Sequence, residues 1–300
     1  MAHVRTYSPS VRIGNWNEEI QLEEDTLKDF LHRRANGQLQ IQKSSGIIEK
    51  MTNPVQLSTS PDGHIRFGDT VMIVNKGNPD RTVYGVGQYP RDDSALAVHI
   101  PDLNNESDGG SSAASLLVLG TKKLSPCIRT AFKVLPANEY AQIGEKLRYS
   151  QPFYLVTAAP EIGQLALYSD VTLFSRCTDK ARHQVAHLVP QFSFQCSWQI
   201  EHKNPLFRLE YEHEPVKAND ACVIQHCKTR QNLCVEENYM INTFFGREYE
   251  ISAHTYLDSH KAEKPVNLWM LVMGVAGDSA YPLSVNETGS QEAKEMKPSV

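Results

Sequence analysis

The sequence predicts a mainly β fold, a β-trefoil-like barrel over residues 61–275. Two observations lead to it. From residue 65 onward, short runs rich in Val, Ile, Leu and aromatic residues alternate with turns that contain Gly and Pro. One phrase, a small or polar turn followed by an apolar strand, also occurs three times, at 67–74, 149–157 and 218–226. Three units of four strands make a β-trefoil, in which six strands close a barrel and three hairpins cap it. Another β-barrel or a β-sandwich stays open as the alternative.

The N-terminal 16 residues are expected to form an extended arm, because they show no periodicity. Ile13 and Trp16 are large apolar residues within it. Such side chains must dock on something, either on the chain's own domain or on a partner. We therefore keep both as candidate partner-binding residues.

Residues 17–60 are expected to hold one amphipathic helix and an irregular segment. The helix spans 17–36, where Ile20, Leu27, Phe30 and Leu31 recur at helical spacing and form one apolar stripe. Phe30 is the third candidate anchor for a partner. Residues 39–57, which contain Gly46 and Pro54, read as irregular, with at most a short piece near Ile47.

The remaining elements are assigned in order along the chain. The strands are expected at 70–74, 96–100, 116–119 and 131–135, then 152–157, 165–168 and 192–200 with a further short strand at 172–175, and then 221–226, 233–236, 249–256 and 268–272. Residues 276–300 are polar and read as a disordered tail.

The stretch from Lys217 to Asn238 reads as a hairpin of the third unit. Its alternating Val, Ile and Cys residues are bounded by polar turns. Its cysteines do not have the spacing of paired metal ligands, so we expect Cys222 in the core. The polar turn 228–232 is a candidate contact loop, with Lys228 and Arg230 as its partner-binding residues.

No catalytic, cofactor-binding or metal-binding motif stands out, so we predict a protein that is not an enzyme. His183 and His187 would share one face of a helix, but the string HQVAH lacks the glutamate of a zinc protease. There is no G-x-S-x-G sequence and no complete phosphate loop. A trefoil that binds a glycan or another small molecule is the alternative function, based on fold analogy alone.

Composition narrows the partners and the compartment. The formal charge of −5 argues against a protein that holds nucleic acid by neutralising phosphates. No apolar run approaches 18 residues, so no membrane partner is expected, and the start of the chain lacks the apolar region of a secretory signal. Cytoplasm or cytoskeleton is the expected location.

Three strings carry a resemblance to a known family: TYSPSVRIGNWNEEIQLEED, FGDTVMIVNKG, and the long stretch from Lys217 to Val272. Across residues 5 to 275 the chain resembles the cilia- and flagella-associated protein 161 family. The last string is also similar to the MIR-type trefoil modules of calcium-release channels and mannosyltransferases.

The resemblance implies a microtubule inner protein. Such a protein lies in the lumen of the axonemal doublet microtubules of motile cilia and flagella. It binds alpha/beta-tubulin and neighbouring microtubule inner proteins, and it supports the lattice during beating. The family brings no catalytic or cofactor residue that could be assigned to a position here.

Overall fold

The structure is a computed structural model that describes residues 16–77, 92–100, 116–138, 140–171 and 177–275. The chain divides into two compact units, Met1–Glu49 and Lys50–Val300. Ile13, the expected short strand at 172–175 and the expected tail at 276–300 lie outside the described residues.

Helix α1 (Trp16–Ala35) is the amphipathic helix that the sequence predicts. Glu18 and Glu19 lie in its first turn and Arg33 and Arg34 in its last, which complements the helix dipole at both ends. Gly37 follows with φ of 67°, a left-handed conformation that ends the helix. The bounds differ from the predicted 17–36 by one residue at each end.

The expected irregular segment is wrong for Gln40–Met51, which forms a second helix, α2. The side chain of Gln42 accepts from the backbone N–H of Leu39 at 3.3 Å and so satisfies one free donor at the N-terminus. Gly46 lowers helix stability by about 1 kcal/mol without ending the helix. Pro54 follows the end of α2, where a proline does not interrupt the hydrogen bonds of the helix.

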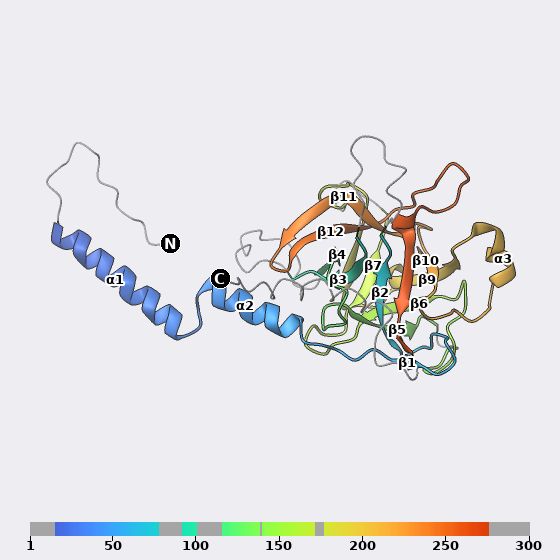
Figure 1. The fold of residues 1–300 in the computed structure, drawn as a ribbon, viewed down its shortest axis with the longest axis horizontal. Helices are drawn as coiled ribbons and strands as arrows, with labels where there is room; N and C mark the ends of the chain where they lie inside the picture. Colours follow the sequence, from blue (N-terminus) through green and yellow to red (C-terminus); the bar gives the residue numbers. More distant parts are fainter. Residues whose placement is uncertain (1–15, 78–91, 101–115, 139, 172–176, 276–300) are drawn as a thin grey trace, which may run out of the picture. The chain divides into compact units, whose positions relative to one another are not determined.

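The second unit contains three successive sets of four strands (Figure 1). The first set is β2 (Thr70–Asn75), β3 (Ser94–Val98), β4 (Leu116–Thr121) and β5 (Ala131–Pro136). The second is β6 (Phe153–Thr157), β7 (Ala166–Ser169), β8 (Gln184–Val189) and β9 (Ser197–His202). The third is β10 (Ala221–His226), β11 (Leu233–Thr243), β12 (Gly246–Ala253) and β13 (Leu268–Val272). The short strands β1 (Thr59–Ser60) and β14 (Gly274–Val275) pair with each other.

The first and last strands of the three sets close a barrel. β2 pairs with β5, β5 with β6, β6 with β9, β9 with β10, β10 with β13, and β13 returns to β2. The third strands of the sets, β4, β8 and β12, pair with one another. A closed six-stranded barrel with three joined hairpins is the β-trefoil, so the predicted fold class is confirmed.

Three equivalent backbone segments meet just before the sets begin. The N–H of Ile65 donates to the carbonyl of Val216 at 3.1 Å, that of Val216 to Leu147 at 2.8 Å, and that of Leu147 to Ile65 at 2.9 Å. All three side chains are buried. The three sets are thus joined by a closed triangle of hydrogen bonds, which we call the backbone triangle.

The repeated phrase also has a repeated backbone conformation. Three residues after each corner of the triangle, the chain turns with positive φ, at Gly68 (97°), Ser150 (63°) and Asn219 (60°). Their N–H groups donate to the last strand of their own set, to the carbonyls of Val134, Ile200 and Leu271. Position and bonding agree in all three sets, which confirms the internal repeat.

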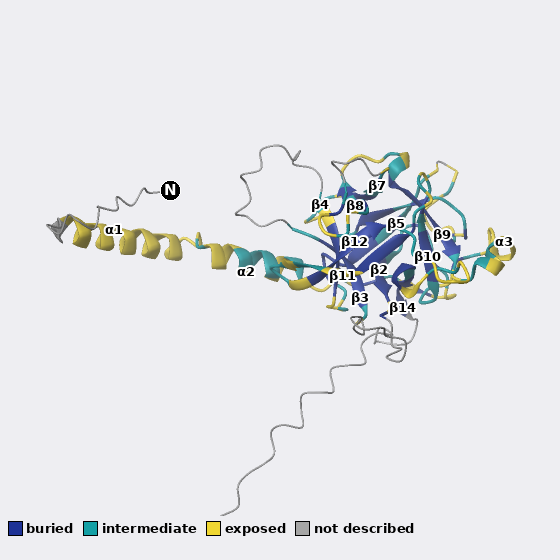
Figure 2. Cartoon of the chain, turned by 90° about the horizontal axis from the view of Figure 1, so that it is seen from above, coloured by how far each residue is buried: buried dark blue, intermediate teal, exposed yellow. Residues whose placement is uncertain are grey.

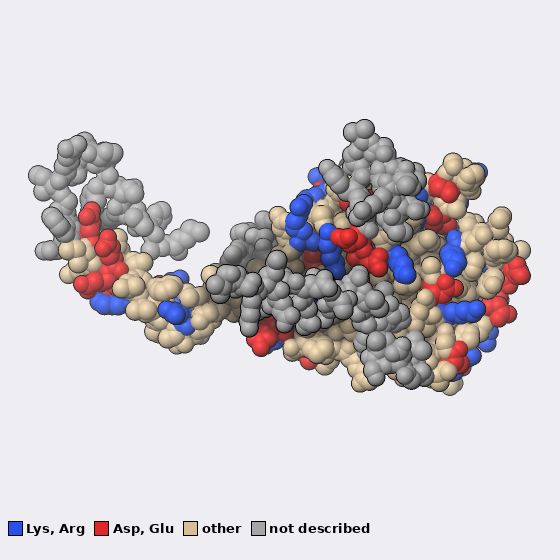
Figure 3. Space-filling view, viewed as in Figure 1, with Lys and Arg blue, Asp and Glu red and all other residues tan. Residues whose placement is uncertain are grey.

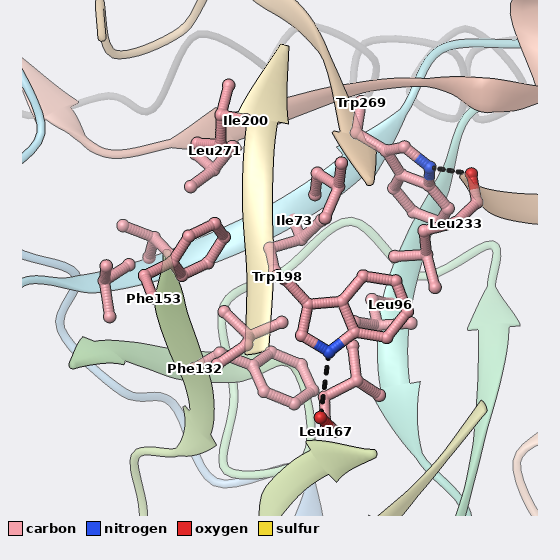
Figure 4. Packing of buried hydrophobic residues seen from close by; sticks show 14 of the residues in the cluster. Ile73, Leu96, Phe132, Phe153, Leu167, Trp198, Ile200, Leu233, Trp269 and Leu271 are labelled. Carbon is pink, nitrogen blue, oxygen red and sulfur yellow. Dashed lines mark hydrogen bonds between the residues drawn. The ribbon is translucent and has the colours of Figure 1, made fainter. Parts of the chain in front are cut away.

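The core is built from equivalent residues as well (Figure 4). Trp198 in β9 donates its indole N–H to the carbonyl of Leu167 at 2.9 Å, and Trp269 in β13 donates to Leu233 at the same distance. The matching residue of the first set is Phe132, also fully buried. Phenylalanine is also a large aromatic side chain, but it has no N–H group that could donate a hydrogen bond.

Several elements differ from the sequence-based assignment. The strand expected at 192–200 begins only at Ser197, because a 3₁₀ turn forms at Phe194–Cys196 before β9. Strand β8 was not predicted, because Val, Ala, Leu and Val in its sequence QVAHLV obscure the alternation, although its side chains alternate between buried and half-buried. After β9, the chain forms a 3₁₀ turn at Pro205–Phe207 and the short helix α3 (Arg208–Tyr211), also not predicted.

Candidate functional site

The apolar stripe of α1 is exposed. Every described side chain from Glu18 to Ala35 is exposed, as Figure 2 shows by the colour of the helix. Leu27 is 58% exposed and Phe30 is 45% exposed. An apolar stripe of this length normally packs on another surface, so α1 is a candidate binding element.

The candidate anchors of the N-terminal segment fall in different places. Trp16 is the first residue of α1, whereas Ile13 precedes the described residues. Phe30 lies in the last half of the same helix, beside Leu31. The structure therefore places Trp16 and Phe30 on one element and says nothing of Ile13.

The turn between β10 and β11 is the predicted contact loop. Lys228 is exposed, and its ammonium group forms an ion pair with Asp170 at 2.8 Å. Arg230 has φ of 58°, and its guanidinium donates to the side-chain oxygen of Gln225 at 3.2 Å. The ion pair holds Lys228 toward the second set, while Arg230 lies over its own hairpin.

A pocket of about 500 Å³ opens beside this turn. Arg182, His183 and Gln184 line it from the start of β8, Lys228, Thr229 and Gln231 from the β10–β11 turn, and His254 from the end of β12. The pocket therefore lies between the second and third sets. We call it the basic pocket, because its charged lining residues are Arg182 and Lys228.

An ordered polar cluster supports one wall of the basic pocket. The imidazole rings of His183 and His254 stack with their centroids 3.9 Å apart. His183 contacts the buried carboxylate of Glu236 at 2.7 Å, and that carboxylate also accepts from Ser252 at 2.5 Å and from Tyr256 at 3.0 Å. Three side chains converge on the carboxylate of Glu236, which fixes the position of His183 and of the His254 ring stacked on it.

Burial changes the acid–base behaviour of groups near this pocket. Removal from water lowers the pKa of His254, and the neighbouring His183 lowers it further. Removal from water also lowers the pKa of His226, whose ring contacts the carbonyl of Gln195 at 2.9 Å and the hydroxyl of Thr229 at 2.8 Å. Both imidazoles are therefore held toward the neutral form.

The cysteines that first suggest a metal site lie in different environments. Cys222 is buried in the barrel core, as expected, and burial raises its pKa to about 12. Cys227 is half-buried, and burial raises its pKa to about 11. Within the described residues, no group of three or more His, Cys, Asp or Glu side chains is placed to hold a metal ion.

The described residues show neither a surface of one charge on the face drawn in Figure 3 nor a helix that could span a membrane. On the face shown in Figure 3, Lys and Arg side chains are interspersed with Asp and Glu. None of the helices found in the described ranges combines the length and the apolar character that crossing a membrane requires.

Sequence reasoning missed most of the basic pocket. It singled out Lys228, but it considered His183 only with His187, as a pair that would share one face if the segment were a helix. His187 lies in strand β8 and contacts Tyr168, whereas His183 precedes that strand and contacts His254. Arg182 carried no sequence signal. The partners of His183 are far from it in sequence, so only the pairing of β8 with β12 brings them together.

A family model described as "Cilia- and flagella-associated protein 161-like domain" matches residues 43–274. The chain is 40% identical to cilia- and flagella-associated protein 161 of Danio rerio over 276 residues, covering 90% of this chain and 89% of that protein. It is 40% identical to the Bos taurus protein of the same name, covering 89% and 82%, and 38% identical to that of Mus musculus, covering 89% and 88%.

Among solved structures, an SDF2-like protein from Arabidopsis thaliana aligns with a TM-score of 0.48 and 11% identity, over 69% of this chain and 93% of that one. The sequence relatives are far more similar, and they match over nearly their full length. The match to the family model and the identity to these relatives show that this chain belongs to the cilia- and flagella-associated protein 161 family.

Proposed function

We propose that this chain is a non-enzymatic structural protein of motile cilia and flagella. In this proposal it binds inside the axonemal doublet microtubules, to alpha/beta-tubulin and to neighbouring microtubule inner proteins, and stabilises the lattice during beating. Membership of the family supports the ciliary context.

The exposed apolar stripe of α1 is the observation that carries the binding role. Its apolar residues from Ile20 to Leu31 are 43–58% exposed, over about three helical turns. Apolar side chains in such a stripe contribute about 1.5–3 kcal/mol each when buried. A helix of this kind gains most of its stability by packing against another surface, and a partner in the lattice would provide that surface.

Confinement makes many weak contacts sufficient. A protein enclosed within a lumen has a high effective concentration at its sites. The segment with Ile13, the helix α1 with Trp16 and its apolar stripe, and the turn with Lys228 and Arg230 would then each need only a modest affinity. Together they would hold the chain in place.

The test uses the full-length tagged chain expressed in motile ciliated cells that lack the endogenous protein. We expect it to remain in salt-washed axonemes and to be released only when doublets are disrupted. The double variant Leu27→Ser/Phe30→Ser should be reduced severalfold in axonemes at equal cellular expression, because it removes two apolar side chains from the exposed stripe.

The matched control is Glu23→Ser/Lys28→Ser, which puts the same two serines on the same helix, keeps the net charge and leaves the stripe intact. Equal axonemal retention of the two double variants would refute a binding role for the stripe. Release of the unaltered chain by mild salt would refute stable incorporation into the lattice.

A further inference from the structure

We propose that the basic pocket is a binding site for a small phosphorylated molecule, held by Arg182 and Lys228. A volume of about 500 Å³ lies within the range of small-molecule sites. The lining comes from two different sets of the trefoil, so the pocket exists only in the folded protein.

The first observation concerns Arg182, one of the two cations that line the basic pocket. Its φ is 59°, a left-handed conformation that glycine or asparagine adopts at lower cost. Arg230 and Lys261 have similar φ values outside the pocket, so it is the place of Arg182 in the pocket lining, and not its backbone conformation, that supports the proposal.

The guanidinium of Arg182 is available to an anion. It donates to the sulfur of Cys177 at 3.6 Å, and among the described residues it forms no ion pair with a carboxylate. A guanidinium presents several donors in one plane, a geometry that matches phosphate oxygens. The charges of Asp179 and Glu250 stabilise the guanidinium from a longer distance, and a bound phosphate would add a direct ion-pair partner.

Lys228 provides a second cation, from the β10–β11 turn. Its ammonium group already contacts Asp170 at 2.8 Å, so an incoming phosphate has to share Lys228 with that carboxylate. Thr229, which also lines the pocket, is held by two hydrogen-bond partners, because Gln184 donates to its hydroxyl at 2.9 Å and His226 lies 2.8 Å from it. The walls are therefore ordered before a ligand arrives.

The same observations favour a phosphate over a neutral sugar. Two cations from two elements face the pocket, whereas a sugar site relies on aromatic stacking and neutral hydrogen bonds. The aromatic groups in the lining are the imidazoles of His183 and His254, and their ring faces already contact each other. The charge of the ligand is thus the property that the pocket recognises.

The experiment is isothermal titration calorimetry on the full chain with glucose 6-phosphate, glucose and inorganic phosphate. We expect saturable binding of glucose 6-phosphate, no binding of glucose, and weaker binding of inorganic phosphate, which fills only part of the volume. Raising the salt concentration should weaken the binding of glucose 6-phosphate and of inorganic phosphate, because the attraction is electrostatic.

Two glycine variants test the residue assignment. Arg182→Gly removes the cation and relieves the left-handed backbone, so the affinity should fall at least about tenfold, as for loss of a charge-assisted hydrogen bond, while the melting temperature is kept or raised. Lys261→Gly makes a comparable change at φ of 60°, on an exposed lysine outside the pocket lining, and should bind as the unaltered chain does.

Asp170→Asn tests the same idea by a gain. It removes the competing charge from Lys228, so glucose 6-phosphate should bind more tightly. Lys228→Gln should bind more weakly, and it serves as the second loss variant if Arg182→Gly fails to fold. The proposal is overturned if glucose 6-phosphate does not bind at a concentration of about 10 mM, which corresponds to a free energy of binding less favourable than that of a millimolar complex. It is also overturned if glucose binds as tightly as glucose 6-phosphate, or if both loss variants keep full affinity.

Discussion

Arg129 and Glu248 form a bidentate ion pair in the interior, with Nη1–Oε1 and Nη2–Oε2 distances of 2.8 and 2.9 Å. The two side chains are 3% and 1% exposed. Arg129 also donates to the carbonyl of Val98 at 3.2 Å, and its guanidinium carbon lies 3.8 Å from the ring centre of Phe245. The pair ties the first set of strands to the β11–β12 hairpin of the third.

Glu248→Ala should destabilise the protein by about 3–5 kcal/mol, because it leaves the charge of Arg129 buried without a partner. Urea unfolding followed by circular dichroism measures the change. The double variant Arg129→Met/Glu248→Leu should be markedly less destabilised, because no charge remains buried. A double variant as unstable as Glu248→Ala would contradict this account.

Gly68→Ala should destabilise the barrel by about 1–2 kcal/mol, because the left-handed backbone disfavours a Cβ atom. An added Cβ would also lie 2.7 Å from the Cγ2 atom of Ile143. Ser150→Gly, at the equivalent position of the second set, should change stability by less than about 1 kcal/mol, since relief of the backbone is offset by a more flexible unfolded chain. The melting temperatures of the two variants decide the prediction, and a Gly68→Ala protein as stable as the unaltered chain would refute it.

Stability should fall as the pH is lowered below about 6.5. The folded state lowers the pKa of His226 from its ordinary value of 6.5 through burial. Below that value the unfolded chain binds a proton that the folded chain excludes, so the free energy of unfolding decreases as the pH falls from 6.5 through the folded pKa. His254 adds to the effect in the same direction.

His226→Gln should be less stable at neutral pH, but its free energy of unfolding should depend less on pH between 7.5 and 5.5. Urea unfolding at the two pH values gives both quantities. If the variant shows the full pH dependence of the unaltered chain, other groups cause the effect.

Cys222 should resist alkylation in the folded protein at pH 8. It is 2% exposed, and burial raises its pKa to about 12, so little thiolate forms. Cys177 is half-buried and should be modified first. Mass spectrometry after treatment with iodoacetamide, with and without urea, gives the order. Modification of Cys222 before Cys177 in the folded protein would contradict the structure.

The sequence was informative wherever a local pattern decided the outcome. The repeated phrase predicted the trefoil because each copy combines a turn at Gly68, Ser150 or Asn219 with a strand that must be buried. Helix α1 was predicted because its apolar residues recur at helical spacing, which is also a local pattern. Residues 40–51 were misread because Gly46 was counted as a breaker, whereas one glycine lowers helix stability without ending the helix.

The pocket could not be predicted, because its parts are brought together only by pairing between sets. Arg182, Lys228 and His254 come from three segments, and none of the three segments carries a motif. The left-handed conformation of Arg182 has no signature in the residue itself. The alternation of apolar and polar residues shows which face of a strand is buried, but it does not show which other strand pairs with it.

The backbone triangle of Ile65, Leu147 and Val216 has a consequence for how the protein reaches its native state. Each hydrogen bond of the triangle joins two residues that are at least 69 positions apart in the chain. Contacts of such long range slow folding, because the chain loses entropy before they form. The triangle closes only when all three sets are present, so a nascent chain released before Val216 has no complete barrel. The amides of the triangle should therefore exchange with solvent only through global opening, and they offer a site-resolved measure of when folding is complete.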